Sequence, residues 1–214
     1  GHIDFLAGNW GHNNKFYSGK NGPTKLYLKD FDNNGAFEQI VTYSIDNKDY
    51  TFLAKDELER ALPVLKKAYL SYGEVAGETV QYMFYDLFKN YTELKAENLG
   101  SSCFINNGKG DFTRIDLPKE LQMAPVFSFT AIPDNGYMAV GNFYGVIPYE
   151  GRYDAMYPTQ FSFDKQSGNF KYSSMMPEVN GEFRDIQWLN NAAGYSTIVL
   201  SRNSDSLLFF KHIK

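Results

Sequence analysis

The loop from Asp30 to Glu38 carries oxygen-bearing side chains at the spacing that a calcium ion requires. Calcium takes about six to eight oxygen ligands, and alternate residues of a tight loop turn inward to supply them. Such side chains stand at loop positions 1, 3, 5 and 9, and Gly35 stands at position 6, where the chain must turn sharply. The candidate metal ligands are Asp30, Asp32, Asn34, the main-chain carbonyl of Ala36, and Glu38. We therefore predict calcium as a cofactor, and an acidic polar turn without a metal is the alternative.

An EF-hand is a rival interpretation of this loop, and the sequence disfavours it. An EF-hand needs a bidentate glutamate at position 12 and flanking helices. Position 12 is Val41, and the flanking segments Leu26–Lys29 and Gln39–Tyr43 are strand-like. Asn34 adds no charge, so a site here is weaker than one with aspartate at that position.

A second candidate site is the loop from Asn142 to Tyr157, which combines aromatic and charged side chains. Aromatic faces beside hydrogen-bonding groups are what a sugar or peptide site requires. The candidate ligand-binding residues are Asn142, Phe143, Tyr144, Tyr149, Glu150, Arg152, Tyr153 and Asp154. In the structural alternative, Arg152 pairs with Asp154 or Glu150 and the tyrosines pack against neighbouring strands.

No pattern of catalytic residues emerges, so we predict that the chain is not an enzyme. Glu150 and Asp154 could form a glycosidase pair only at a suitable carboxylate separation, which the sequence does not give, and Arg152 between them favours a salt bridge. A nucleophilic Cys103 would need a nearby histidine, but all three histidines lie close to the chain ends. As a lone cysteine, Cys103 is expected to be a small buried apolar residue.

Composition and charge exclude several classes of partner. Hydrophobic residues make up 43% and charged residues 21% of the 214 residues, a balance typical of a globular chain. The net charge of −4 and the lack of clustered Lys and Arg argue against nucleic acid. No apolar stretch approaches the ~20 residues that span a membrane. Aromatic residues reach 17%, which favours β structure.

Internal repeats indicate how the strands are organised. Three short apolar segments each run into an asparagine: Ile3–Gly11, Tyr137–Gly145 and Ser196–Asn203. Two further segments, Phe104–Phe112 and Phe161–Phe170, are strands joined by a glycine turn, and each should be a hairpin. We expect the phenylalanines on either side of each turn to fix the register by packing across the strands.

The repeats predict a mainly β fold built from four-stranded antiparallel blades, as in a β-propeller. The predicted strands are Val126–Thr130, Tyr137–Gly141, Gln160–Phe163, Phe170–Ser173, Phe183–Leu189, Ser196–Leu200 and Leu207–Lys211. The chain would hold about three blades, against about 4–8 in a closed propeller. We expect one domain over 1–214, with open edges at Ile3–Gly8 and Leu207–His212. These edges would be capped by a helical segment or paired in a homodimer.

A helical insertion is expected at about 55–98. Asp56 and Glu59 have the spacing of a capping box at a helix start, and Pro63 should kink or split that helix. A second helix is indicated by an apolar stripe at helical spacing. The stripe consists of Val80, Met83, Phe84, Leu87 and Phe88.

The Asp30–Glu38 loop between strands resembles the calcium loop of FG-GAP/VCBS repeats, the blades of integrin-α-like propellers. Phe104–Phe112 resembles the hairpin of such blades. Gly141–Gly145 and Glu150–Ala155 resemble segments in the C-terminal part of bacterial VCBS-repeat proteins. The resemblance implies a secreted or lipid-anchored protein in an extracellular, periplasmic or outer-membrane surface location, often connected with polysaccharide uptake. Asp134–Gly136 keeps only the turn of the calcium loop, so no second calcium site is expected.

These observations lead to a functional hypothesis of a non-catalytic binding or scaffold module. It would bind a glycan or a protein, and calcium would stiffen one loop. The alternatives are a glycan-processing enzyme that uses the acids of the 142–157 loop, and a purely structural role. The leading glycine is typical of tag removal, so we interpret the chain as an excised fragment whose lack of a signal peptide carries no information about location.

Overall fold

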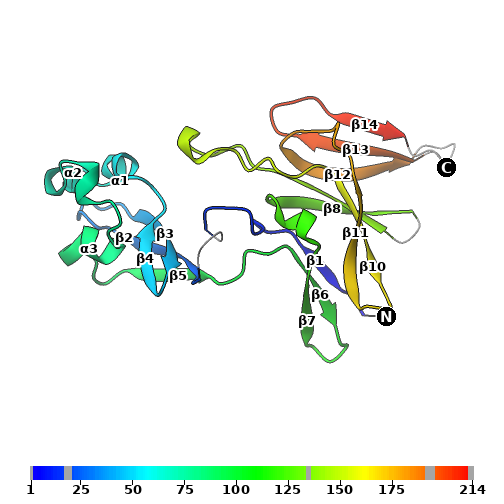
Figure 1. The fold of residues 1–214 in the computed structure, drawn as a ribbon, viewed down its shortest axis with the longest axis horizontal. Helices are drawn as coiled ribbons and strands as arrows, with labels where there is room; N and C mark the ends of the chain where they lie inside the picture. The colour runs from blue at the N-terminus through cyan, green and yellow to red at the C-terminus, as the bar shows by residue number, and fades with distance from the viewer. Residues whose placement is uncertain (1, 17–20, 134–135, 191–195, 212–214) are drawn as a thin grey trace. The chain divides into compact units, whose positions relative to one another are not determined.

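The computed structural model describes residues 2–16, 21–133, 136–190 and 196–211, which form two compact units (Figure 1). Unit 1 comprises 1–14 and 99–214, and unit 2 comprises 15–98. The prediction of a mainly β fold is confirmed, because the described residues form four antiparallel sheets and few helices. Unit 2 contains the predicted helical insertion together with the strands that precede it. Residues 134, 135 and 191–195 lie outside the described residues, so the expectation that Asp134–Gly136 forms no second calcium site stays a prediction.

Unit 1 contains three antiparallel sheets, with strand orders β1-β6-β7, β11-β10-β9-β8 and β12-β13-β14. We call them sheets I, II and III. The strands of sheet I are β1 (Phe5–Ala7), β6 (Ser102–Asn106) and β7 (Phe112–Asp116). Those of sheet II are β8 (Val126–Ile132), β9 (Gly136–Gly141), β10 (Thr159–Asp164) and β11 (Asn169–Met175). Those of sheet III are β12 (Phe183–Asn190), β13 (Ser196–Arg202) and β14 (Leu208–Lys211). All seven strands predicted between 126 and 211 are present within a few residues of their expected bounds.

Sheet II lies between two apolar cores because successive strand residues face opposite sides. In β9, Ala139 joins a core with residues of sheet I such as Cys103. Its neighbours Met138 and Val140 join a core with Ile186 of sheet III. Two polar contacts tie sheet II to sheet III: the Ser128 hydroxyl donates to Asp185 over 2.7 Å, and Trp188 Nε1 donates to the Ala131 carbonyl over 2.6 Å. Cys103 is buried, as expected from its setting.

Both predicted hairpins form, but only one has the expected phenylalanine pair. Phe163 lies opposite Phe170 with ring centroids 5.1 Å apart. Phe104 instead lies opposite Arg114 on one side and Phe5 on the other, because the turn from 107 to 111 offsets the two strands. The expectation that Phe104 and Phe112 pair across the hairpin was therefore wrong. Phe112 packs against Phe5 at 5.5 Å.

The three Asn-terminated repeats are all strands in the structure, namely β1, β9 and β13. The two later ones have equivalent hydrogen bonds at their ends. The backbone amide of Asn142 donates to the Pro125 carbonyl just before β8. The backbone amide of Asn203 donates to the Glu182 carbonyl just before β12, and each bond is 2.8 Å long. Strands β1 and β14 are edges of their sheets within the described chain, as the sequence predicted.

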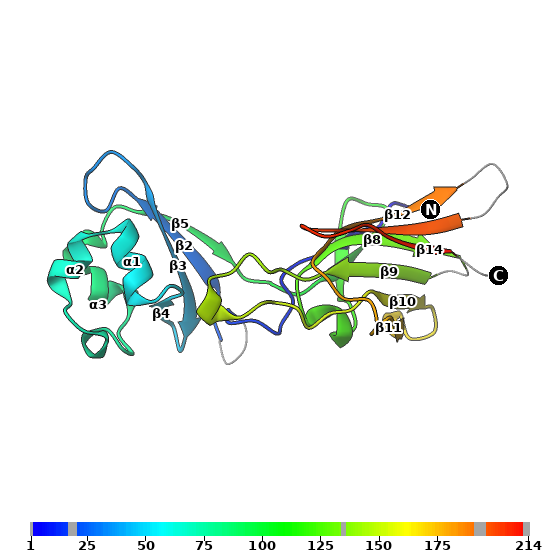
Figure 2. The same cartoon turned by 90° about the horizontal axis from the view of Figure 1, so that it is seen from above.

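Unit 2 is a four-stranded antiparallel sheet with helices over one face (Figure 2). Its strands, in the order β4-β3-β2-β5, are β2 (Thr24–Lys29), β3 (Glu38–Ile45), β4 (Lys48–Thr51) and β5 (Thr92–Ala96). Its helices are α1 (Lys55–Ala61), α2 (Val64–Ala68) and α3 (Val80–Phe84), with 3-10 turns at Tyr72–Glu74 and Tyr85–Leu87. Alternate residues of β3 are buried, and Ile40 packs with Leu58, Leu62 and Phe84 in the core.

The helix starts differ from the sequence prediction. The Asp56–Glu59 capping box is absent: α1 begins at Lys55, its N-cap is Ala54, and Glu59 pairs with Lys55. Glu59 pairs with the charged side chain of Lys55, one helical turn earlier, and does not accept a hydrogen bond from a backbone N–H at the helix start. Pro63 separates α1 from α2, as expected, because proline lacks the amide hydrogen of a continuous helix.

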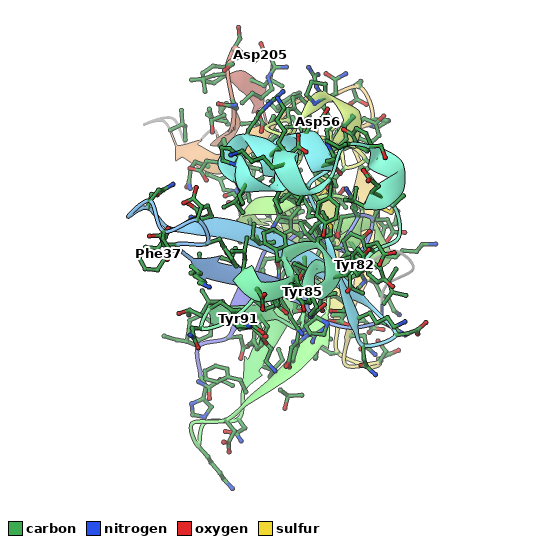
Figure 3. All side chains as sticks on the ribbon, turned by 90° about the vertical axis from the view of Figure 1, so that its left-hand side faces the viewer. Phe37, Asp56, Tyr82, Tyr85, Tyr91 and Asp205 are labelled. Carbon is green, nitrogen blue, oxygen red and sulfur yellow. The ribbon has the colours of Figure 1, made fainter. Side chains whose placement is uncertain are left out.

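The apolar stripe predicted from Val80 to Phe88 is in the core, although the helix stops early. Val80 and Phe84 are buried, and Leu87 and Phe88 pack against the same core. Helix α3 ends where Tyr85 adopts φ of 37°, which a helix does not tolerate. Tyr82 and Tyr85 project from the exposed side of this segment, with 54% and 77% of their surfaces exposed (Figure 3).

Candidate functional site

The predicted calcium loop connects β2 and β3, so it is flanked by strands and not by the helices of an EF-hand. The carboxylate oxygens of Asp30, Asp32 and Glu38 lie within 4.8 Å of one another. Gly35 has φ of 89°, a backbone conformation that favours glycine and lets the chain fold back over these carboxylates. The structure thus brings together three of the five predicted ligands.

Backbone amides hold these carboxylates in place. Asp30 accepts hydrogen bonds from the amides of Asn34 (2.9 Å) and Gly35 (2.8 Å), and Glu38 accepts one from Phe31 (2.7 Å). The Asn34 side-chain oxygen, a predicted ligand, accepts from the Ala36 amide over 2.7 Å.

Lys29, at the end of β2 next to this loop, does not pair with these carboxylates. Its ammonium group donates to the Leu87 carbonyl over 2.8 Å. Within the described chain, none of the three carboxylates forms an ion pair. Three close carboxylates without a protein cation repel one another, and a bound cation would relieve that repulsion.

The 142–157 loop follows β9 and is anchored by Asn142, which is 1% exposed. Its side-chain amide nitrogen donates to the carbonyls of Met156 (2.7 Å) and Gly181 (2.8 Å), and its oxygen accepts from the Met156 amide (3.1 Å). The φ of 81° at Asn142 turns the chain out of the strand, in the region that asparagine tolerates better than other side chains. Asn142 is therefore a scaffold for the loop, and its buried side chain is not a ligand contact.

Phe143 and Tyr144 extend from this anchor towards two different hollows. Phe143 bridges to Tyr153 in an antiparallel arrangement, so consecutive side chains point to opposite sides. The Phe143 hollow, of about 510 Å³, is lined by Gly8, Asn9, Trp10, Pro125, Val126, Phe127 and Phe143. The Tyr144 hollow, of about 400 Å³, is lined by Tyr144, Gly145, Gly181, Glu182, Asn203, Ser204 and Asp205.

Of the remaining predicted residues of this loop, some pack against other side chains and others are exposed to solvent. Tyr153 is 9% exposed and lies edge-on to Trp10 at 5.1 Å, so it packs as the structural alternative expected. Arg152 stacks on Tyr144 at 4.7 Å from the ring centre. Tyr149 is 53% exposed and Asp154 is also exposed, so both remain accessible. Glu150 ends a short 3-10 turn, Pro148–Glu150.

Glu182, which lines the Tyr144 hollow, forms a polar centre with Arg184, and the sequence singled out neither residue. The buried carboxylate of Glu182 accepts from the Tyr144 amide (2.9 Å) and the Asn203 side chain (2.6 Å), and it pairs with Arg184. The Arg184 guanidinium lies over Phe127 at 4.3 Å and over Phe143 at 5.7 Å. These residues come from four separate segments between 127 and 203, so only the fold brings them together.

Burial opposes ionisation of Glu182, but three donors outweigh it and lower the pKa of the Glu182 carboxyl below its ordinary value. A carboxyl with a lowered folded pKa stabilises the fold at pH above its unfolded pKa, and that stability is lost as the pH falls.

We therefore predict that unit 1 loses stability below about pH 4–5. Glu182→Gln should be less stable at neutral pH and show a shallower loss towards acid, as measured by urea unfolding across pH. If the free energy of unfolding falls equally steeply with decreasing pH in the natural chain and in Glu182→Gln, the Glu182 carboxyl does not have a lowered pKa in the folded state.

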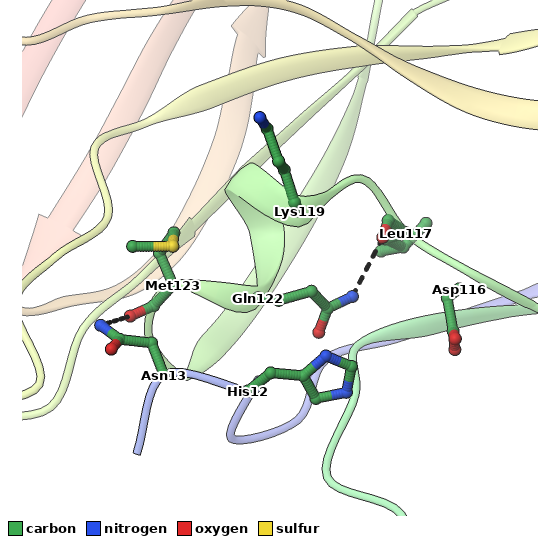
Figure 4. A pocket seen from close by; sticks show the side chains of 7 residues that line it. All are labelled: His12, Asn13, Asp116, Leu117, Lys119, Gln122 and Met123. Carbon is green, nitrogen blue, oxygen red and sulfur yellow. Dashed lines mark hydrogen bonds between the residues drawn. The ribbon is translucent and has the colours of Figure 1, made fainter. Parts of the chain in front are cut away.

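A third hollow, of about 470 Å³, lies beside the 3-10 turn Lys119–Gln122 (Figure 4). It is lined by His12, Asn13, Asp116, Leu117, Lys119, Gln122 and Met123. The buried Gln122 side chain donates to the carbonyls of Ser101 (2.8 Å) and Leu117 (3.1 Å), so it serves the fold. Asp116 is bound by Arg114 and Ser102, and its pKa lies below the ordinary value because these donors and charges outweigh burial. The one carboxylate among the lining residues is therefore already paired with Arg114.

No protein-family model, no curated protein and no solved structure matches the chain. The resemblance to FG-GAP/VCBS repeats accordingly stays a prediction from the residues. No helix in the described parts of the chain is long and apolar enough to cross a membrane.

Proposed function

We propose that the chain is a non-catalytic binding or scaffold module that takes a glycan or protein ligand at one end of unit 1. The observation that carries this proposal is the convergence of five segments around the two hollows. They follow β1, β9 and β13 and precede β8 and β12, which in antiparallel sheets places them at the same end. Loops at one end of a rigid sheet assembly are a common location for ligand binding.

We further propose that the three sheets are propeller-type blades of the FG-GAP/VCBS kind, in a secreted or cell-surface bacterial protein. Supporting features are the antiparallel order of each sheet, the repeated Asn at the end of β9 and β13, and the two cores on opposite faces of sheet II. Pairing of the β1 and β14 edges in a homodimer belongs to the same proposal.

Ligand retention and ligand turnover distinguish the module from an enzyme. The intact chain, immobilised and exposed to panels of oligosaccharides and surface proteins, should retain a ligand that is recovered unchanged. Tyr144→Ala should weaken retention about tenfold or more. Tyr172→Ala, on β11 with 39% of its surface exposed, is the control that should not.

The alternative is a glycan-processing enzyme that uses Glu150 and Asp154. It is favoured only by their location on the same loop as the exposed Tyr149. Turnover of an oligosaccharide that Glu150→Gln abolishes would replace the binding proposal with this one. If no ligand is retained or altered, the purely structural role is supported instead.

We also propose that calcium binds Asp30, Asp32 and Glu38 and stiffens the β2–β3 loop. Binding to the folded state alone raises its melting temperature. We expect millimolar calcium to raise the melting temperature of unit 2 by several degrees relative to chelator, and Asp30→Ala to abolish the shift. Asp46→Ala, in the exposed turn between β3 and β4, should keep it. An unchanged melting temperature in the natural chain would identify the loop as an acidic turn.

A further inference from the structure

Asparagine stands directly before glycine at several places in the chain, and such a pair can react without an enzyme. The glycine nitrogen attacks the side-chain amide carbon of the asparagine, because no Cβ on the glycine blocks the approach. A carbon–nitrogen bond forms, ammonia leaves with the proton of the glycine amide, and a cyclic imide remains. Water then opens the imide to aspartate or isoaspartate. The pairs begin at Asn21, Asn34, Asn107, Asn135 and Asn180, of which Asn135 lies outside the described residues.

The pairs at Asn34 and Asn107 are held at both reacting groups. The glycine amide after Asn34 donates to Asp30 over 2.8 Å, and the Asn34 side-chain oxygen accepts from the backbone amide two residues on over 2.7 Å. The glycine amide after Asn107 donates to the Asn106 side chain over 2.8 Å, and the Asn107 side-chain oxygen accepts from the backbone amide two residues on over 2.7 Å.

The side chain of Asn21 is held as well. Its nitrogen donates to the Asp46 carboxylate, and its oxygen accepts from the Asp46 backbone amide, each over 2.7 Å. A reaction at any of these three pairs must first break hydrogen bonds that the folded chain makes, which slows the attack.

The pair Asn180–Gly181, just before β12, lacks such bonds. The Asn180 side chain is exposed, and within the described chain it forms no hydrogen bond. The Gly181 backbone amide donates none there either. A Cβ at Gly181 would come 2.5 Å from the Arg202 side chain, so packing favours the reactive glycine at this position. Both reacting groups are therefore available in the folded chain.

The backbone that would change supports the 142–157 loop. The Gly181 carbonyl accepts from the buried Asn142 side chain over 2.8 Å. Isoaspartate at position 180 lengthens the main chain by one carbon atom, which displaces this carbonyl from Asn142. Either product also adds a negative charge two residues before the buried carboxylate of Glu182.

We propose that Asn180 deamidates spontaneously in the folded protein and that this change weakens the Asn142 anchor of the 142–157 loop. Gly181 also lines the Tyr144 hollow, so the change alters one wall of the proposed binding site. Only this last consequence rests on the proposed function.

The test is to age the intact chain at mildly alkaline pH, which favours loss of the glycine amide proton, and to follow each Asn–Gly peptide by mass spectrometry after digestion. We expect the Asn180 peptide to gain the mass of the amide-to-acid change several-fold faster than the peptides of Asn21, Asn34 and Asn107. In guanidinium chloride, where the chain is unfolded and these hydrogen bonds are absent, the four peptides should convert at similar rates.

Two outcomes of this experiment would overturn the inference. In one, Asn180 converts no faster in the folded chain than the other three asparagines. In the other, its lead persists unchanged after unfolding, so the hydrogen bonds of the fold do not select the site.

Asn180→Ser is the matched variant for the effect on the anchor. Serine has no side-chain carbonyl and cannot form the imide, and the variant should fold because the Asn180 side chain makes no hydrogen bond within the described chain. After ageing, unit 1 of the natural chain should unfold at a lower urea concentration than unit 1 of Asn180→Ser. Equal midpoints would overturn the effect on the anchor. Neither measurement uses a ligand, so their failure leaves the proposed function standing, and a chain that retains no ligand leaves this inference standing.

Discussion

Replacing Asn142 by alanine is expected to destabilise unit 1 by about 3–5 kcal/mol and to abolish ligand retention. The buried side chain makes three hydrogen bonds, to Met156 and Gly181, which alanine cannot replace. Alanine also tolerates the φ of 81° poorly. Urea unfolding measures the stability, and the panel assay measures the retention.

Asn142→Gly separates the two causes. Glycine adopts the positive φ without strain but lacks the side-chain hydrogen bonds, so it should recover only part of the stability. If Asn142→Ala unfolds at the same urea concentration as the natural chain, Asn142 does not anchor the loop.

The second large effect concerns the independence of the two units. Leu62 belongs to the core of unit 2 and Leu121 to a core of unit 1, and both are 0% exposed. Each Leu→Ala change should cost about 2–5 kcal/mol. Because the cores share no residue, calorimetry should show two transitions, with Leu62→Ala lowering one and Leu121→Ala lowering the other.

Each variant is the control for the other. A single transition that both variants lower equally would mean that the chain unfolds as one domain, as the sequence predicted. Two separate transitions would mean that residues 15–98 fold as an inserted unit. The Gly11 amide donates to the Leu99 carbonyl over 2.7 Å, so the insertion leaves and rejoins unit 1 at neighbouring points.

Local patterns were sufficient to predict most strands of unit 1, because glycine turns and alternating apolar residues depend on near neighbours. The hairpin from Phe161 to Phe170 was predicted with its register, since its turn is short enough to align the two phenylalanines. Phe104 does not pair with Phe112 in the same way, because a longer turn changes which residues of the two strands face each other. The capping box predicted from Asp56 and Glu59 does not form, because Glu59 pairs with Lys55 one helical turn earlier.

The candidate site was predictable only in part. The three carboxylates of the 30–38 loop are close in sequence, so their proximity followed from loop spacing. In the 142–157 loop, the sequence identified Phe143 and Tyr144 but not that they face different hollows. Trp10 belonged to a recognised repeat, yet its contact with Phe143 joins residues more than 130 positions apart, and no local signal indicates such contacts.

We propose that a ligand binds where the segments after β1, β9 and β13 converge. Hydrogen–deuterium exchange of the intact chain, with and without an oligosaccharide or protein that it retains, tests this most directly. We expect slower exchange on ligand binding at 8–11, 125–127, 142–157, 181–184 and 203–205, and unchanged exchange in the β10–β11 hairpin. Protection confined to that hairpin or to the helices of unit 2, with none in the converging segments, would contradict it.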